Sequence, residues 1–306
     1  MDLLKSSYSK QLVKKLNRVE AYQQNSIELR QTLGFIAKVF VIANLPHREQ
    51  FGEKEWIRKN GKYVLRLSAG EKYVNEKLVS AGLPYGTYAR LLMMWLTTQA
   101  LRTKSRKVFL KKTLSSLMKE LDIQPTGGKK GTITYFKEQF VRLCCCRVAI
   151  DEVQMGEDLI GTQFFIVEDK FVKWLQDHES SFVEEDSYIM LNEKFYELIV
   201  KSSIPFDFNV ITALKQSSIA IDVYIWLTYR AFTLKQPTII SWRQVQEQMG
   251  TQYSDLRNFM NKMKKVILQI RMFYPDINIE YVHGGMKIHP SEAHVIPLND
   301  HVKVAA

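Results

Sequence analysis

Residues 84–101, which read PYGTYARLLMMWLTTQAL, decide the fold of this chain of 306 residues. The stretch is strongly apolar all round, so it predicts a helix that lies inside a core. A short strand at Lys107–Leu110 follows, and Thr113 is placed to cap a second helix whose apolar residues recur every three or four positions. A third helix is predicted from Thr132 to about Cys145. Helix, strand, helix, turn and helix in this order indicate a helix-turn-helix motif.

Two further strands follow the third helix. The runs Arg147–Val153 and Gln163–Val167 lie on either side of a turn at Gly156–Gly161. We therefore predict a β-hairpin here, which would be the wing of a winged helix-turn-helix.

The same order of elements recurs in the second half of the chain. The tripeptide Trp-Leu-Thr stands at residues 95–97 and again 131 positions later at residues 226–228, in the first helix of each set. Val108-Phe109 likewise lies 131 positions before Ile239-Ile240. Internal duplication of one module explains both matches. The predicted elements of the second set are helices at Ser218–Phe232, Trp242–Met249 and Asp255–Phe273, a strand at Thr238–Ile240, and a hairpin of Ile277–Tyr281 with Met286–Ile288.

The predicted fold class is therefore α+β and mainly helical, with two tandem winged helix-turn-helix domains. We place the first domain at residues 35–176 and the second at 188–297. An acidic connector at 177–187 joins them, a helical N-terminal arm occupies 1–34, and a C-terminal tail occupies 298–306.

Charge is distributed unevenly along the chain. In total, 43 Lys and Arg residues face 32 Asp and Glu residues, a formal net charge of +11. Residues 81–150 carry 13 basic and 3 acidic residues, whereas residues 151–200 carry 3 basic and 13 acidic ones. A basic block of this size is typical of a surface that binds a polyanion, because neutralised phosphates release condensed counterions. A solvated basic face on any globular protein is the alternative interpretation.

The third helix of each module is where contacts with DNA are expected, because that helix of a winged helix-turn-helix enters the major groove. In the second module, the face opposite the apolar stripe holds no acid. Arg binds guanine through two hydrogen bonds, Asn reads adenine, and Lys suits phosphates. The candidate DNA-binding residues here are Tyr253, Arg257, Asn258, Asn261, Lys264 and Lys265.

The first module presents a mixed face, because Glu138 would cost affinity near a phosphate. Lys129 and Lys130 precede its third helix, where their charges and the helix N-terminus both favour a phosphate. The candidate DNA-binding residues are Lys129, Lys130, Thr134, Tyr135 and Arg142, with Lys111 and Lys112 as contacts to the phosphate backbone. For every candidate in both modules, a solvated amphipathic helix face is the alternative.

The sequence lacks the common motifs of enzymes that act on nucleotides or bind metals. Gly127-Gly128-Lys129-Lys130 is similar to part of a phosphate-binding loop, but Ile123 and Lys130 stand where that motif requires Gly and Ser or Thr. The six histidines form no His-Glu-x-x-His pattern, and the cysteines at residues 144–146 lack the spacing of a zinc site. We therefore expect no catalytic activity, no metal and no cofactor.

Apolar runs in the sequence are short. The longest, Leu91–Leu96 and Val39–Ala43, fall far below the roughly 20 residues of a membrane helix. The start Met1–Lys5 lacks the pattern of a secretory signal. We expect a soluble cytoplasmic protein with no membrane partner.

Many short blocks between residues 35 and 297 follow a characteristic order. They include Leu83-Pro84-Tyr85-Gly86, Trp95-Leu96-Thr97, Thr113-Leu114-Ser115-Ser116-Leu117-Met118 and Gly285-Met286-Lys287-Ile288-His289-Pro290-Ser291. In these blocks the chain resembles the plasmid-encoded RepA replication initiators. It departs from them at Lys111-Lys112, where the family tends to have Leu-Gly, and at Cys144-Cys145, where an aromatic residue is usual.

The resemblance implies a bacterial plasmid initiator, associated with the nucleoid or a plasmid. Such a protein would bind repeated sites in double-stranded origin DNA, help to melt adjacent DNA, and recruit the host replicative helicase and initiator. It would exist as a homodimer in equilibrium with a monomer, and the dimer would often repress its own gene. Composition and spacing by themselves predict only a basic, duplicated winged-helix protein.

Two alternatives from other classes stay open. A winged-helix transcription regulator would usually carry a ligand-binding or dimerisation domain in place of the second module. A DNA-processing enzyme, such as a primase or nickase, would form a metal-dependent product on origin DNA.

Overall fold

The computed structural model describes residues 32–295 except 75, 154–158, 176–185 and 252. The predicted arm at 1–34 and connector at 177–187 therefore lie almost wholly outside the described residues. The predicted tail at 298–306 lies wholly outside them.

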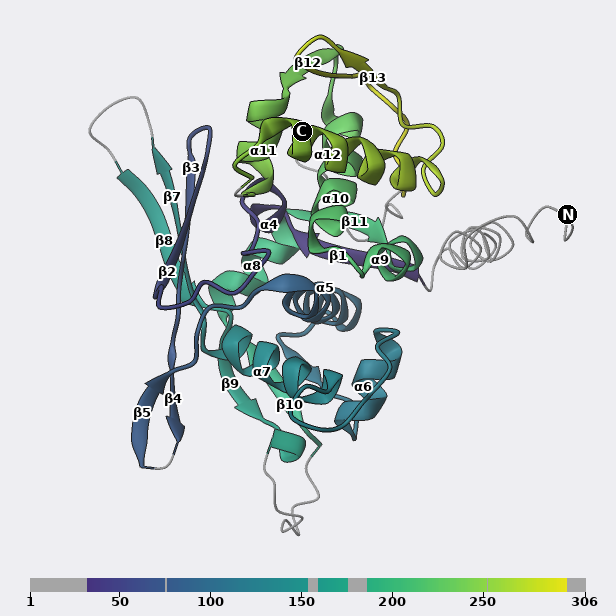
Figure 1. Ribbon diagram of the computed structural model, residues 1–306. Helices are drawn as coiled ribbons and strands as arrows, with labels where there is room; N and C mark the ends of the chain where they lie inside the picture. Colours follow the sequence, from purple (N-terminus) through teal and green to yellow (C-terminus); the bar gives the residue numbers. More distant parts are fainter. Residues whose placement is uncertain (1–31, 75, 154–158, 176–185, 252, 296–306) are drawn as a thin grey trace, which may run out of the picture. The chain divides into compact units, whose positions relative to one another are not determined.

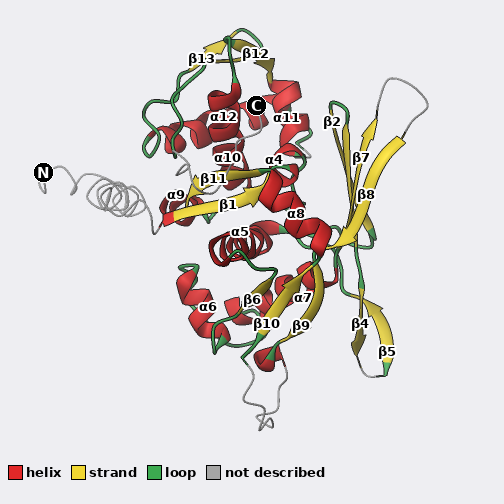
Figure 2. Cartoon of the chain, turned by 180° about the vertical axis from the view of Figure 1, so that it is seen from behind, coloured by secondary structure: helices red, strands yellow, loops and turns green. Residues whose placement is uncertain are grey.

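The described chain forms two compact units (Figures 1 and 2). The N-terminal unit consists of residues 35–204 and 247–251, and the C-terminal unit consists of residues 32–34, 205–246 and 253–295. Strands β1 (Leu33–Ala37) and β11 (Ser203–Asp207) contain two of the points at which the chain passes from one unit to the other. The domains at 35–176 and 188–297 stay a prediction.

Helix α5 (Gly86–Thr103) is the buried centre of the N-terminal unit. Its residues 89–98 are buried on every side, as their all-round apolar character predicts. Arg90 is the one charged residue among them. Its guanidinium donates hydrogen bonds to the Leu45 carbonyl at 2.7 Å and to the Pro46 carbonyl at 3.0 Å. A buried charge needs such partners, so Arg90 ties the chain around Pro46 to α5.

Helices α6 (Leu114–Glu120) and α7 (Thr132–Cys145) confirm the predicted second and third helices. Thr113 caps α6, because its Oγ1 accepts a hydrogen bond from the Ser116 amide at 3.1 Å. On α7, Phe136, Phe140 and Leu143 form the buried stripe that their spacing indicates.

A three-stranded antiparallel sheet completes this helical set. Its strands lie in the order β6 (Lys107–Phe109), β10 (Tyr188–Leu191), β9 (Val167–Phe171). Strand β10, the last of the three in the sequence, therefore lies in the centre and pairs with both β6 and β9.

The two strands predicted as the wing exist, but the prediction that they complete the helix-turn-helix motif was wrong, because they belong to another sheet. Strands β7 (Arg147–Val153) and β8 (Leu159–Phe165) pair with each other, but β7 also pairs with β3 (Tyr63–Ser68), which pairs with β2 (Glu55–Asn60). They thus belong to a separate sheet of order β2-β3-β7-β8. The physical reason is the apolar inner face of β3, where Leu65 and Leu67 are buried.

The remaining elements of the N-terminal unit are short. Phe195 on the helix 193–201 contacts two other elements. Its ring lies 6.4 Å from that of Phe40 on the helix 39–42, and it stacks on Phe164 of β8 at 5.9 Å between ring centroids. The short elements are α4 (Val39–Ile42), the hairpin β4 (Glu71–Val74) with β5 (Lys77–Ser80), η2 (Lys173–Leu175) and α8 (Glu193–Lys201).

The C-terminal unit is built around α10 (Ser218–Thr233), which is buried like α5. Strands β12 (Thr238–Ser241), β14 (Gly285–Ile288) and β13 (Ile279–Val282) form an antiparallel sheet in that order. Helices α9 (Phe208–Leu214) and α12 (Leu256–Arg271) also belong to this unit, and α11 (Trp242–Met249) belongs to it as far as Gln246.

The two units share one order of elements and one strand order, in which the first strand pairs with the last. Trp95 and Trp226 are both buried in the first helix of their sets. In the following strand, however, buried Val108 corresponds to buried Ile240, since Ile239 is exposed. Val108 and Ile240 are 132 positions apart, so the structural match in this strand differs by one residue from the 131-residue repeat of the sequence.

The described residues mix helices and sheets, so the expectation of a mainly helical protein fits only in part. Within the described part of the chain, no helix combines the length and the apolar character that crossing a membrane requires.

Candidate nucleic-acid interface

Helix α12 presents an exposed polar face. Phe259, Met263 and Ile267 are buried, and this orientation leaves the other side of the helix in solvent. The Asp255 carboxylate caps the helix by accepting a hydrogen bond from the Arg257 amide at 2.7 Å. The fully exposed predicted residues are Arg257, Asn258, Asn261 and Lys265.

Two other predicted residues of this set are half-buried. The ammonium of Lys264 lies 5.2 Å from the centre of the Tyr281 ring on β13, a cation–π contact. The Tyr253 ring packs edge-on against Phe259 at 5.6 Å, and its carbonyl accepts a hydrogen bond from Gln246 at 2.8 Å. Tyr253 and Lys264 therefore border the exposed face and stabilise its edges.

The turn before α7 holds Lys129 and Lys130 in solvent. Thr126 and Thr132 close the turn, because the amide of each donates to the hydroxyl of the other at 2.9 Å. Gly131 is required at its end, since a Cβ there would lie 2.3 Å from the Thr126 carbonyl oxygen. The turn is thus a built feature that precedes the open N-terminus of α7, where Thr134 and Tyr135 are also exposed.

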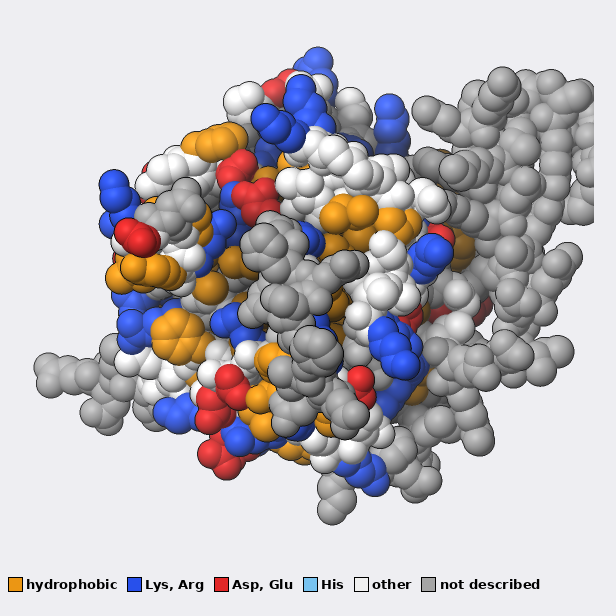
Figure 3. Space-filling model, turned by 90° about the horizontal axis from the view of Figure 1, so that it is seen from below, with side chains coloured by type: hydrophobic (Ala, Val, Ile, Leu, Met, Phe, Trp, Pro, Cys, Tyr) orange, Lys and Arg blue, Asp and Glu red, His pale blue; other side chains and the backbone are white. Residues whose placement is uncertain are grey.

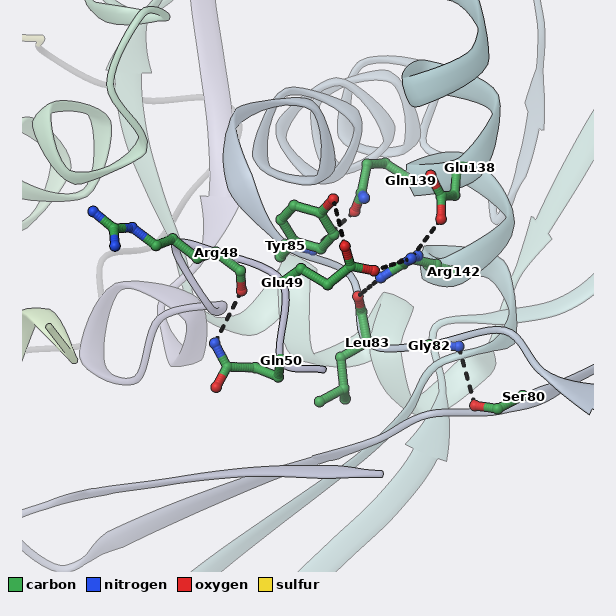
Figure 4. A network of polar contacts seen from close by, with 10 residues as sticks. All are labelled: Arg48, Glu49, Gln50, Ser80, Gly82, Leu83, Tyr85, Glu138, Gln139 and Arg142. Atoms are coloured by element: carbon green, nitrogen blue, oxygen red, sulfur yellow. Dashed lines mark hydrogen bonds and ion pairs between the residues drawn. The ribbon is translucent and has the colours of Figure 1, made fainter. Parts of the chain in front are cut away.

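Arg142 does not lie on the exposed face of α7. Its guanidinium is buried and pairs with Glu49 at 2.5 Å and with Glu138, and it also donates to the Leu83 carbonyl at 3.2 Å (Figure 4). Its Cζ lies 5.1 Å from the centre of the Tyr85 ring. The structure therefore separates Arg142 from the other predicted DNA-binding residues.

Burial acts on the pKa of Arg142 by lowering it, but the hydrogen bonds to Glu49 and Glu138 outweigh burial and leave the pKa raised. The guanidinium therefore stays charged. Gln139 is buried too, and its side-chain oxygen accepts a hydrogen bond from the Tyr85 amide at 2.8 Å. Together, Arg142 and Gln139 fix α7 to the N-terminus of α5 (Figure 4).

Lys111 and Lys112 are exposed just after β6. Lys111 forms an ion pair with Glu120 at 3.2 Å, both side chains being substantially exposed. Basic side chains elsewhere lie in separate groups among hydrophobic ones, as the view from below shows (Figure 3). On the face seen in Figure 3, positive charge therefore lies in several groups.

Sequence reasoning missed Glu49, which decides where Arg142 points. The two residues are 93 positions apart, and no periodicity or motif links them.

Among the described residues, no group of three His, Cys, Asp or Glu side chains is placed to hold a metal ion. Cys144 and Cys146 are buried, and burial raises the pKa of each thiol to about 12. Neither is a thiolate near neutral pH, and the thiolate is the nucleophilic form.

Comparison with known proteins adds the identity of the family. Residues 83–244, just over half of the chain, match the family described as plasmid-encoded RepA protein. The chain belongs to the plasmid-encoded RepA family. This membership confirms the predicted resemblance, supports a role in the initiation of plasmid replication, and implies DNA binding.

Two crystal structures of domains 2 and 3 of RctB resemble this RepA-family chain, one of them a selenomethionine derivative. Their TM-scores are 0.53 and 0.52, both at 10% sequence identity. The likeness covers 82% of this chain in each case, and 95% and 94% of the RctB chains. At such identity the likeness shows the fold alone. A search of the curated proteins found no match.

Proposed function

We propose that this chain is a plasmid replication initiator that binds repeated sites in double-stranded origin DNA sequence-specifically. The observation that carries the proposal is the exposed face of α12. Arg257, Asn258 and Asn261 offer groups that read base edges, and neighbouring Lys265 offers a phosphate contact.

We assign both units as winged helix-turn-helix modules. Each contains helix, strand, helix, helix and two more strands, with the first strand paired to the last. This arrangement supports α12 as the helix that enters the major groove of one DNA segment, and α7 as its counterpart on another.

The N-terminal module contributes mainly phosphate contacts in this proposal. Lys129 and Lys130 are held in solvent before the N-terminus of α7, where their charges and the positive end of the helix dipole both favour a phosphate. Thr134 and Tyr135 extend this surface, and Lys111 and Lys112 flank it in the sequence as backbone contacts. Arg142 serves it indirectly, by fixing α7.

Family membership supports the later steps of initiation as part of the same proposal. The bound protein would promote melting of adjacent origin DNA and recruit the host replicative helicase and initiator. A homodimer in equilibrium with the monomer would repress the gene of the protein itself.

A protection footprint of the full chain on DNA next to its gene tests the proposal. We expect protection of direct repeats spaced by about two helical turns, each read through the major groove. The Asn261→Ala variant should lose protection of the repeats, whereas Val200→Ala, at an exposed position of α8 outside the helices and strands of both proposed modules, should keep it.

Two results would contradict this assignment in favour of its rivals. Protection of a promoter alone, with no plasmid maintenance defect on deletion, would indicate a transcription regulator. A metal-dependent product on origin DNA would indicate a processing enzyme.

A further inference from the structure

Three aromatic residues lie in one row across the sheet β6-β10-β9. In the register of this sheet, Tyr188 is directly opposite Phe109 on one side and Phe171 on the other. Directly opposed residues of neighbouring strands point to the same face of a sheet. The next residues along, Val108 and Ile189, are buried, so the aromatic row occupies the opposite, outer face.

The row is accessible to solvent. The Phe109 side chain is 58% exposed. Tyr188 and Phe171 are half-buried, and their rings lie 6.3 Å apart, tilted by 37°. The rings therefore form a shallow platform of adjacent aromatic faces.

Lysine side chains lie over this platform. The ammonium of Lys107 is 4.1 Å from the centre of the Tyr188 ring and 5.4 Å from that of Phe109. The ammonium of Lys173 is 5.9 Å from the centre of the Phe171 ring. Positive charge thus lies over the middle ring of the row, Tyr188, and near one end of it, Phe171.

Two acids lie near the row. The Tyr188 hydroxyl donates a hydrogen bond to Asp169 at 3.0 Å, and Glu168 pairs with Arg106 at 3.0 Å. Beside these acids, Lys107 and Lys173 bring positive charge to the aromatic rings, a combination that suits a polyanion whose other component stacks.

The corresponding row of the C-terminal sheet lacks this chemistry. There, Gly285 pairs with Ser241 and with Val282, in the positions of Tyr188, Phe109 and Phe171. The strand order alone therefore does not require aromatic residues in this row.

We infer that the outer face of β6-β10-β9 binds single-stranded DNA, with unpaired bases stacked on Phe109, Tyr188 and Phe171 and phosphates bound by Lys107 and Lys173. Aromatic rings between basic groups are the usual means of holding unpaired strands without sequence preference, since every base has a face that can stack. The inference rests on the proposed function in one respect, because melting of an origin supplies such strands.

Fluorescence anisotropy with the full chain and two labelled probes tests this inference. One probe is oligo(dT) of about 20 nucleotides, and the other is an abasic strand of the same length, which keeps the phosphates but offers nothing to stack. We expect the wild-type chain to bind oligo(dT) more tightly. The Phe109→Ala variant should lose about 5- to 150-fold in affinity for oligo(dT), because stacking contributes roughly 1 to 3 kcal/mol per base. Its affinity for the abasic strand should not change.

Matched variants separate stacking from general effects. Tyr73→Ala removes an aromatic residue that is 70% exposed on the separate β4-β5 hairpin, and should change neither affinity. Lys107→Gln should reduce the salt dependence of oligo(dT) binding by about 0.7 in slope, the value for one phosphate contact on a single strand. Circular dichroism should show the fold of each variant to be intact.

Equal loss on both probes, or no loss for Phe109→Ala, would overturn the inference and leave the face to a protein partner. The origin footprint is scored separately. If the chain protects the duplex repeats but the Phe109→Ala variant binds oligo(dT) as tightly as the wild type, only this inference is refuted. A chain that binds oligo(dT) through Phe109 without protecting repeats refutes only the proposed function.

Discussion

Helices α7 and α12 stand at the same place in their units, yet the chain uses them differently. Matching the buried residues Phe136 with Phe259, and Phe140 with Met263, places Arg142 opposite Lys265. Arg142 is buried between two glutamates, whereas Lys265 is exposed. One position on a repeated helix thus holds a buried, ion-paired arginine in one unit and an exposed lysine in the other.

The sheets repeat this lesson with the roles reversed. The N-terminal sheet exposes aromatic rings, while the C-terminal sheet has Ser241, Gly285 and Val282 in the same row. Shared strand order fixes which residues face outwards but not what those residues are. The two proposals together assign different roles to the units, with base reading in duplex DNA on α12 and stacking of single strands on β6-β10-β9.

Removal of Arg142 is the strongest test of the difference between the helices. Arg142→Met leaves Glu49 and Glu138 without their cation, and breaking a buried ion pair costs about 3 to 5 kcal/mol. Because the two carboxylates are about a third exposed, we expect a smaller loss, roughly 2 to 3 kcal/mol, in the stability of the N-terminal unit. Hydrogen exchange of peptides within residues 35–204, measured against urea, reports this stability.

The matched variant Lys265→Met should change stability by less than about 0.5 kcal/mol, as is usual for exposed positions. A second change sharpens the test: Glu49→Gln added to Arg142→Met should recover part of the loss, since fewer buried charges stay unpaired. Equal effects of Arg142→Met and Lys265→Met would show that the two helices are used alike.

Base reading by α12 is tested by Arg257→Ala. A bidentate contact of Arg with guanine contributes about 1 to 3 kcal/mol of discrimination, so affinity for the protected origin repeats should fall by that amount. Affinity for unrelated duplex DNA should fall much less. Thr134→Ala, at the matched position of α7, should reduce both affinities alike. Unchanged binding of the repeats by Arg257→Ala would remove this residue from the proposed interface.

Lys265→Ala provides a weaker but separate measure of phosphate contact. Loss of one phosphate contact should lower the slope of log affinity against log salt by about one on every duplex sequence. Lys265 is better suited than Lys264, because removal of Lys264 also removes a contact with Tyr281. A salt slope equal to that of the wild-type chain would show that Lys265 lies off the DNA.

The sequence predicted the helical elements well because their signals are local. The bounds of α7, the Thr113 cap and the repeated helix-strand-helix order all follow from periodicity and capping within a few residues. The partner of β6 was missed because β10 lies about 80 residues further along, beyond the inserted pair β7 and β8.

Side-chain direction was the other failure, and Arg142 illustrates it. A helical wheel places it near the polar side of α7, but its partner Glu49 comes from a loop before β2, far away in the sequence. The exposed residues of α12 were easier to predict, since the helix has a clear apolar stripe and their side chains need no distant partner. Local patterns therefore identify the exposed face of a helix, while ion pairs with residues far away in the sequence decide which of its polar side chains are buried.

A stability that depends on pH is expected in the C-terminal unit because of His294. The His294 ring is held by the Phe273 carbonyl at 2.9 Å on Nε2 and the Tyr224 hydroxyl at 2.9 Å on Nδ1. Nε2 therefore donates, and neutral Nδ1 accepts from Tyr224. Burial lowers the pKa of His294, and the Phe273 hydrogen bond and nearby Asp276 oppose burial only in part.

The sign follows from the proton balance. The unfolded chain binds a proton at His294 near pH 6.5, whereas the folded chain binds it only at lower pH, so stability decreases as pH falls below about 6.5. After correction for the intrinsic rate of amide exchange, which itself slows as pH falls, hydrogen exchange of peptides within residues 205–246 and 253–295 should accelerate in that window. His294→Gln should abolish this acceleration, while His283→Gln, at an exposed turn, should keep it. Acceleration that persists in His294→Gln would assign the pH dependence to another group, and the two units would then differ in surface chemistry alone.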